Sequence, residues 1–144
     1  MCYNLNSAVE EICIEIEDPS DNAHVIYTTR RLAAQAGFNE TMQVLIATAA
    51  SELSTNIIRY AKKGKVTLKI IQDINSKGIE IIAQDKGPGI DNINQAMQEH
   101  FSTGNGLGLG LPSVQRIMDE FDIQSKLNHG TCIIGRKWRK NARN

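Results

Sequence analysis

The chain has 144 residues, of which 41% are hydrophobic, and its formal net charge is zero. This length and composition fit a single globular domain, residues 1–144, and exclude a disordered chain. The charge gives no reason to expect a nucleic-acid partner, and no hydrophobic run approaches the roughly 20 residues of a membrane span. We therefore expect a cytoplasmic protein without nucleic-acid or membrane partners, in which Cys13 and Cys132 are buried, reduced thiols.

The first half of the chain predicts one strand followed by two helices. Isoleucine alternates with glutamate over residues 9–17, which is the period of a half-buried strand. A helix then runs to about Ala36 and ends at the following glycine. A second helix, capped by Asn39 or Thr41, reaches about Lys62, which makes it long for a domain of this size.

The second half of the chain predicts two hairpins with two shorter helices between them. The strands are expected at residues 65–72, 78–84, 122–127 and 131–138, and the helices at residues 93–99 and 113–121. Short polar connections within each strand pair indicate antiparallel pairing. The whole pattern predicts an α+β fold, a two-layer sandwich with a mixed, mostly antiparallel sheet and helices on one face.

One stretch stands out because four glycines occur at every second position. They are Gly104, Gly106, Gly108 and Gly110, with Leu107 and Leu109 between the last three. Such a loop, followed by the helix that begins at Pro112, is a suitable anion site, because free backbone N–H groups and the helix dipole both favour negative charge. A flexible linker is the alternative. Neither the P-loop pattern nor the Rossmann pattern fits the spacing.

Glu52 and Asn56 are four residues apart on the second helix and therefore share one face. An asparagine oxygen is a neutral, hard ligand suited to Mg²⁺, and a glutamate can take a proton from an attacking hydroxyl group. The alternative is a solvated glutamate and an outward-facing asparagine, which are common on any helix.

Asp85 ends a hydrophobic strand and is followed by Gly87 and Gly89. A carboxylate there can accept a hydrogen bond from the amine of adenine, and the glycines let a flat base approach the backbone. Thr131, which opens the last strand, can support the same base through its hydroxyl group. A plain turn at Asp85 and ordinary strand propensity at Thr131 are the alternatives.

The order of these segments resembles the Bergerat-type ATP-binding fold of the GHKL superfamily, which includes gyrase-type ATPases, Hsp90 chaperones, histidine kinases and MutL proteins. Residues 52–56 resemble its N box, residues 85–89 its G1 box, residues 104–110 its G2 box, and Gly130-Thr131 its closing Gly-Thr pair. The resemblance spans residues 39–138. The bare ATP-binding domain and the sequence of residues 106–121 are similar to the small partner-switching serine/threonine kinases of bacteria, above all the RsbT type of stressosome kinase.

The resemblance implies ATP and Mg²⁺ as cofactors and a role for each matching residue. Asn56 would coordinate Mg²⁺, Glu52 would be the general base, and Asp85 would bind the adenine amine. The residues Gly87, Gly89 and Thr131 would lie beside the base, and Gly104, Gly106, Leu107, Gly108, Leu109 and Gly110 would enclose the phosphates. No lysine follows the last glycine, so Arg59 or Arg116 is a candidate for additional phosphate charge.

The same resemblance implies the partners. STAS-domain proteins of the stressosome would be the substrates, and a PP2C-type phosphatase would be activated once the kinase is released, as part of a stress response. Three alternatives remain open: an anti-sigma factor kinase of the RsbW type, a regulatory module that binds partners in an ATP-dependent way, and an ATPase fragment like gyrase or MutL.

Overall fold

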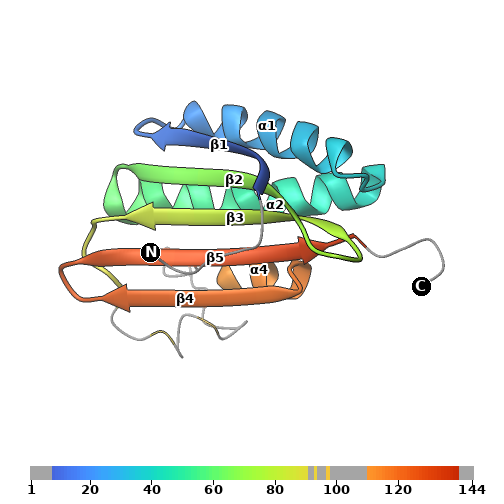
Figure 1. Cartoon of the computed structure of the whole chain (residues 1–144). Helices are drawn as coiled ribbons and strands as arrows, with labels where there is room; N and C mark the ends of the chain where they lie inside the picture. The colour runs from blue at the N-terminus through green and yellow to red at the C-terminus, as the bar shows by residue number, and fades with distance from the viewer. Residues whose placement is uncertain (1–7, 91–92, 94–96, 98–109, 140–144) are drawn as a thin grey trace.

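The structure, a computed structural model, describes residues 8–90, 93, 97 and 110–139. Five strands form one sheet in the order β1-β2-β3-β5-β4 (Figure 1). The strands are β1 Ala8–Ile16, β2 Gly64–Gln72, β3 Lys77–Asp85, β4 Glu120–Lys126 and β5 Gly130–Trp138. Every ladder between these strands is antiparallel, including the two predicted hairpins β2–β3 and β4–β5.

The helices all cover one face of this sheet (Figure 1). They are α1 Asp21–Gln35, α2 Glu40–Asn56, the π-helix η1 Ile57–Ala61 and α4 Leu111–Ile117. The predicted α+β two-layer sandwich is confirmed. No helix in the described part of the chain is long and hydrophobic enough to cross a membrane.

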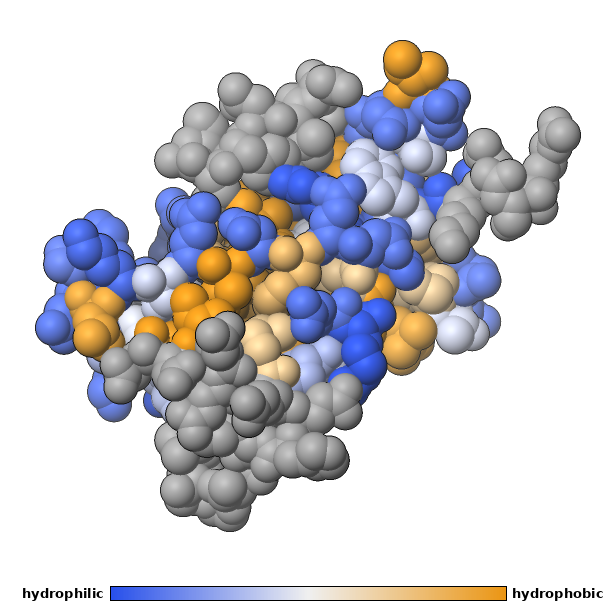
Figure 2. All heavy atoms as spheres, turned by 90° about the horizontal axis from the view of Figure 1, so that it is seen from below, coloured by the Kyte–Doolittle hydropathy of each residue, from blue (hydrophilic) through white to orange (hydrophobic). Residues whose placement is uncertain are grey.

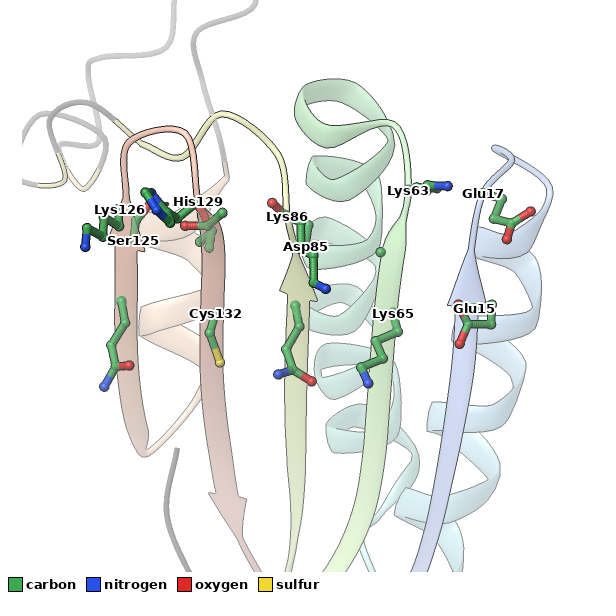
Figure 3. Close-up of a pocket in the computed structure, with 15 residues that line it drawn as sticks. Glu15, Glu17, Lys63, Lys65, Asp85, Lys86, Ser125, Lys126, His129 and Cys132 are labelled. Atoms are coloured by element: carbon green, nitrogen blue, oxygen red, sulfur yellow. Dashed lines mark hydrogen bonds between the residues drawn. The ribbon is translucent and has the colours of Figure 1, made fainter. Parts of the chain in front are cut away.

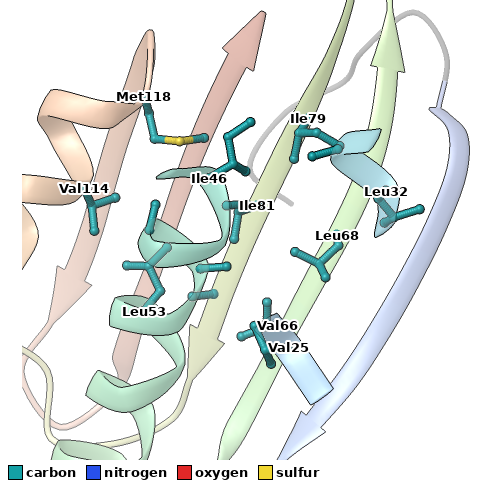
Figure 4. Packing of buried hydrophobic residues seen from close by; sticks show 14 of the residues in the cluster. Val25, Leu32, Ile46, Leu53, Val66, Leu68, Ile79, Ile81, Val114 and Met118 are labelled. Carbon is teal, nitrogen blue, oxygen red and sulfur yellow. The ribbon is translucent and has the colours of Figure 1, made fainter. Parts of the chain in front are cut away.

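The hydrophobic core fills the space between the helices and the sheet (Figure 4). Ile14, Val66, Ala83 and Ile133 are register partners across four strands, and each is at most 5% exposed. Alternate residues of a strand point to the same face, so this row and its neighbours form a continuous hydrophobic surface. Leu53 of α2 is among the buried helix residues that cover it. Burial of each such side chain contributes about 1.5–3 kcal/mol.

The outer face of the sheet carries a row of alternating charges across all five strands. Glu11, Lys69, Glu80, Arg136 and Glu120 are successive register partners from β1 to β4. Ion pairs link each to the next, with 2.9 Å between Arg136 Nε and a carboxylate oxygen of Glu80. Only 1% of the Glu80 side chain is exposed.

The long second helix begins as predicted and ends differently. Asn39 is its N-cap, and its side-chain oxygen accepts a hydrogen bond of 2.9 Å from the backbone N–H of Met42. The α-helical geometry stops at Asn56. The next five residues form η1, closed by a 2.8 Å hydrogen bond from Lys62 N–H to the carbonyl oxygen of Ile57, five residues earlier.

The helix predicted over residues 113–121 ends four residues earlier than expected. Helix α4 stops at Ile117, Met118 is extended, and β4 already begins at Glu120. The cause is pairing with β5: Asp119 N–H donates to the carbonyl oxygen of Arg136 at 2.8 Å. The short helix predicted over residues 93–99 lies largely outside the described residues. Of the two that are described, Met97 donates from its N–H to the carbonyl oxygen of Ile93 at 3.0 Å.

The expectation of two buried thiols was wrong for Cys13, which is exposed, while Cys132 is partly buried. Both cysteines lie on the outer face of the sheet, because their neighbours Ile14 and Ile133 point toward the helices. Cys13 is also on β1, which is an edge strand.

Seen from its β4 edge, the molecule presents a hydrophobic area in the middle of its surface (Figure 2). Three partly buried residues on this side, Ile117, Phe121 and Ile123, pack against the core. They come from α4 and β4, so the short helix covers the sheet at its β4 end.

Candidate functional site

Asp85 is the last residue of β3 and lies between Gly64 of β2 and Thr131 of β5. Its carboxylate accepts a 2.8 Å hydrogen bond from the backbone N–H of Gly87, and the backbone of Thr131 also hydrogen-bonds to it. Burial raises the pKa of Asp85, and these two hydrogen bonds oppose the shift. The structure thus joins Asp85, Gly87 and Thr131, three of the predicted site residues, in one cluster.

The glycines beside Asp85 are required by close backbone contacts. A Cβ atom on Gly87 would stand 2.6 Å from the Cβ atom of Ala61, the last residue of η1. Gly89, with φ of +82°, lies against the backbone of Lys126, where a Cβ atom would stand 2.5 Å from the carbonyl oxygen. The loop after β3 is therefore held between the π-helix and β4.

Ser125 belongs to this cluster and was not predicted. Its Oγ accepts a 2.7 Å hydrogen bond from Ile90 N–H and lies 2.9 Å from Thr131 Oγ1. Ser125 and Thr131 are register partners in the β4–β5 hairpin. A signal was present in the sequence, because the turn around residue 128 places the two hydroxyl groups opposite each other once the hairpin register is counted.

Glu52 and Gly110 form the second part of the site. A Cβ atom on Gly110 would stand 2.7 Å from Cδ of Glu52. Gly110 has a φ of +70°, precedes α4, and accepts a 2.8 Å hydrogen bond from Ser113 Oγ at its carbonyl oxygen. Gly110, the last glycine of the glycine-rich stretch, therefore lies directly against the carboxylate of Glu52.

Asn56 lies one helical turn after Glu52, at the residue where α2 changes into η1. The following π-turn connects the two parts of the site. Ile57, its first residue, lies near Gly64, where a Cβ atom would stand 3.0 Å from Ile57 Cγ2 and 3.1 Å from Asp85 Cβ. Ala61, its last residue, contacts Gly87. Isolated π-turns within helices are frequent at functional sites.

The remaining predicted residues of the glycine-rich stretch, Gly104, Gly106, Leu107, Gly108 and Leu109, lie outside the described residues. Of the two arginine candidates, Arg59 is on η1 with its guanidinium carbon 5.9 Å from the centre of the Tyr60 ring, and Arg116 is in the last turn of α4. Both side chains are exposed.

The oxygen donors on α2 are the candidate metal ligands that this site offers. No group of three or more His, Cys, Asp or Glu residues that could hold one occurs in the described ranges. The amide oxygen of Asn56 and the carboxylate of Glu52 remain as oxygen donors on one helix face. This fits a hard cation such as Mg²⁺, which keeps several waters and is bound by few protein ligands together with substrate phosphates.

Comparison with known proteins matches residues 41–139 to the family described as histidine kinase-, DNA gyrase B-, and HSP90-like ATPase. The serine/threonine-protein kinase RsbT of Bacillus subtilis is 42% identical over 129 residues, which cover 90% of this chain and 97% of that protein. The anti-sigma F factor of Clostridium kluyveri is 33% identical over 96 residues, 64% of this chain and 68% of that protein. The anti-sigma F factor of a Thermoanaerobacter species is 37% identical over 94 residues, 61% and 64% of the two chains.

Proposed function

Because the chain belongs to the family of histidine kinase-, DNA gyrase B- and HSP90-like ATPases, and there to the partner-switching kinases of the RsbT type, we propose that it phosphorylates STAS-domain proteins. The enzyme is a serine/threonine protein kinase that uses ATP. The proposed reaction moves the γ-phosphate of ATP to a serine or threonine hydroxyl group of a STAS-domain protein in a bacterial stress-response pathway.

The contact between Glu52 and Gly110 carries this proposal. Gly110 is the last residue of the glycine-rich stretch that is expected to enclose the phosphates, and the Glu52 carboxylate lies against it. There it can accept the proton of an acceptor hydroxyl group as the oxygen attacks phosphorus. Phosphoryl transfer depends mainly on positioning and charge neutralisation. One general base and a correctly positioned phosphate are therefore the types of component that the reaction requires.

The adenine is proposed to bind at the other cluster. The Asp85 carboxylate is held in place by backbone N–H groups, and its remaining lone pairs can accept a hydrogen bond from the exocyclic amine of the base. The backbone of Thr131 hydrogen-bonds to this carboxylate, and Thr131 Oγ1 lies 2.9 Å from Ser125 Oγ. Gly87 and Gly89 are proposed to lie beside the base, in a loop that packs against Ala61 and Lys126.

We propose that Asn56 holds Mg²⁺ together with the ATP phosphates. A bound Mg²⁺ would neutralise phosphate charge during transfer. Arg59 and Arg116 are the proposed sources of further positive charge, since Arg59 follows Asn56 on η1 and Arg116 lies on the helix that begins after Gly110.

The proposed pathway places the kinase in the cytoplasm, with STAS-domain components of the stressosome as substrates. After phosphorylating them, the kinase would be released and activate a PP2C-type phosphatase. A second candidate is an anti-sigma factor kinase, favoured by the 33% identity to the anti-sigma F factor of Clostridium kluyveri over 96 residues.

The test is transfer of labelled γ-phosphate from ATP, with Mg²⁺, to STAS-domain proteins of the same genome. We expect acid-stable label on serine or threonine, lost in Glu52→Ala while ATP binding is retained. Glu40→Ala, which removes an exposed glutamate from the first turn of the same helix, is the matched control. Transfer that persists in Glu52→Ala would contradict the base assignment, and tight ATP binding without transfer to any STAS-domain protein would contradict the proposed substrate class.

A further inference from the structure

A groove of about 730 Å³ lies on the outer face of the sheet, away from the helices, at the end where β3 stops (Figure 3). Its floor contains the row Lys65, Gln84, Cys132 and Gln124, which are successive register partners from β2 to β4. The floor is therefore polar, with two side-chain amides that can both donate and accept hydrogen bonds. Glu52 does not line this groove, whereas Asp85, Ser125 and Thr131 do, so the groove borders the proposed adenine site.

Four lysines line this groove: Lys63, Lys65, Lys86 and Lys126. Lys63 directly precedes β2, Lys65 lies in β2, Lys86 directly follows β3, and Lys126 ends β4. Figure 3 shows them spread across the groove rather than gathered at one point. All four are exposed, and none forms an ion pair within the described ranges. The nearby acidic side chains of Glu15 and Glu17 lie on the β1 side.

Elsewhere on the same face of the sheet, charged side chains form ion pairs with one another. Toward the middle of the strands, Glu11, Lys69, Glu80, Arg136 and Glu120 neutralise one another in a continuous row of ion pairs. The lysines of the groove form no such ion pairs in the described part of the chain, although Glu15 is the register partner of Lys65. The four lysines outnumber the carboxylates of Glu15, Glu17 and Asp85, which line the same groove. An excess of positive charge around a concave surface attracts acidic partners and accelerates their association.

We propose that this groove is a docking site for an acidic segment of a partner protein. Lysines arranged along the groove match carboxylates that are spaced along a polypeptide, whereas a single small anion needs donors that converge on one point. The amides of Gln84 and Gln124 can bond to the backbone of such a segment. Glu15 and Glu17 repel acidic residues, so the segment lies over β2, β3, β5 and β4 and ends before β1.

The test uses a fluorescein-labelled glutamate-rich peptide, its binding to the full chain followed by fluorescence anisotropy and by amide shifts in NMR. The double variant Lys65→Glu/Lys126→Glu should bind the peptide at least about tenfold more weakly, because two attractive charge contacts are replaced by repulsive ones. The control Lys77→Glu makes the same kind of charge change at an exposed position at the opposite end of β3 and should bind like the wild type.

If the charge reversals impair folding, Lys65→Gln/Lys126→Gln provides a milder variant, expected to weaken binding in the same direction. Higher ionic strength should weaken binding of the wild type more than of the double variant. Amide shifts confined to the groove strands would support the proposal. It does not depend on the kinase assignment, since the readout is peptide binding.

Three results would overturn the proposal. Equal affinity of the wild type and the double variant would show that the groove lysines do not bind the peptide. Full competition by inorganic phosphate at similar concentration would show a small-anion site. Absence of peptide binding, together with self-association of the wild type that the double variant loses in sedimentation, would show an interface between two copies of the chain.

Discussion

Glu52 and Gly110 pack so closely that no side chain fits between them. A Cβ atom on Gly110 would stand 2.7 Å from Cδ of Glu52, and Gly110 also has a φ of +70°, which L residues rarely adopt. This contact links helix α2 to the start of α4 and determines where the Glu52 carboxylate can lie.

We predict that Gly110→Ala slows phosphoryl transfer by displacing Glu52 from its position. Loss of a positioned general base costs about 10²–10⁴-fold in rate, and a displaced base should lie near the lower end of that range. The measurement is single-turnover transfer at saturating ATP. The control is Gly135→Ala, whose Cβ atom would stand 3.0 Å from the flexible Met118 side chain beyond α4. Wild-type transfer by Gly110→Ala would contradict the proposed base.

ATP affinity should fall as the pH is lowered, because of Asp85. Burial raises its pKa, so Asp85 takes up a proton at a higher pH than an ordinary aspartate does. A protonated carboxyl is a weaker acceptor for the adenine amine. The dissociation constant for ATP should therefore rise as the pH falls from neutral through the raised pKa.

Calorimetric titrations with ATP at several pH values check this prediction. Asp85→Asn is expected to bind ATP more weakly at every pH and to lack the part of the pH dependence that belongs to Asp85. Titration of ATP itself is common to both proteins and cancels in the comparison. Parallel curves for the two proteins would rule out Asp85 as the group responsible.

The contact between Gly87 and Ala61 predicts a variant and its rescue. Gly87→Ala should weaken ATP binding strongly, because the new Cβ atom would stand 2.6 Å from Ala61 Cβ and push the loop away from Asp85. The second change Ala61→Gly removes one of the two clashing atoms and should restore part of the affinity, although Ala61 Cα would still be 2.9 Å away. ATP affinities of the single and double variants provide the measurement, and equal affinities would disprove the coupling.

Much of this fold could be predicted from residue patterns. The alternation in β1, the Asn39 cap and the two hairpins follow from local periodicity and turn chemistry, and the structure confirms them. Asp85 and Thr131 lie on separate strands, and residue chemistry together with the resemblance to a known family brought them into one hypothesis. Their direct pairing is a property of the sheet register.

The parts that could not be predicted depend on contacts between distant segments. The end of α4 is set by pairing of Asp119 with Arg136, which overrides local helix propensity. The π-turn over η1 leaves no local signal in the sequence. Its last residue, Ala61, lies against Gly87, 26 positions later in the numbering (87 − 61). Hydrophobic periodicity describes one element at a time and therefore does not report such contacts.

Arg136→Met should destabilise the fold far more than Lys137→Met. Arg136 hydrogen-bonds to Glu80, whose side chain is 1% exposed. Its loss leaves a buried carboxylate whose one remaining ion-pair partner among the described residues is Lys69, at 3.8 Å. Breaking a buried pair in this way costs about 3–5 kcal/mol. Lys137 pairs with the more exposed Asp119, a contact worth about 0–1 kcal/mol. Urea unfolding of both variants is the measurement, and equal losses would contradict the prediction.

The loss in free energy of unfolding caused by Arg136→Met should also depend on pH, because the protonation of Glu80 changes with pH. Burial already raises the pKa of Glu80 in the folded protein, while the Arg136 hydrogen bond lowers it, so removal of Arg136 raises it further. In the variant, the pKa of Glu80 is higher in the folded protein than in the unfolded chain. Such a group stabilises the fold at a pH below its pKa in the unfolded chain, and this contribution is lost as the pH rises through its pKa in the folded protein. The variant should therefore lose more stability at neutral pH than in mild acid, where Glu80 is protonated. A loss that stays constant over this range would show that Glu80 is not the group left unpaired.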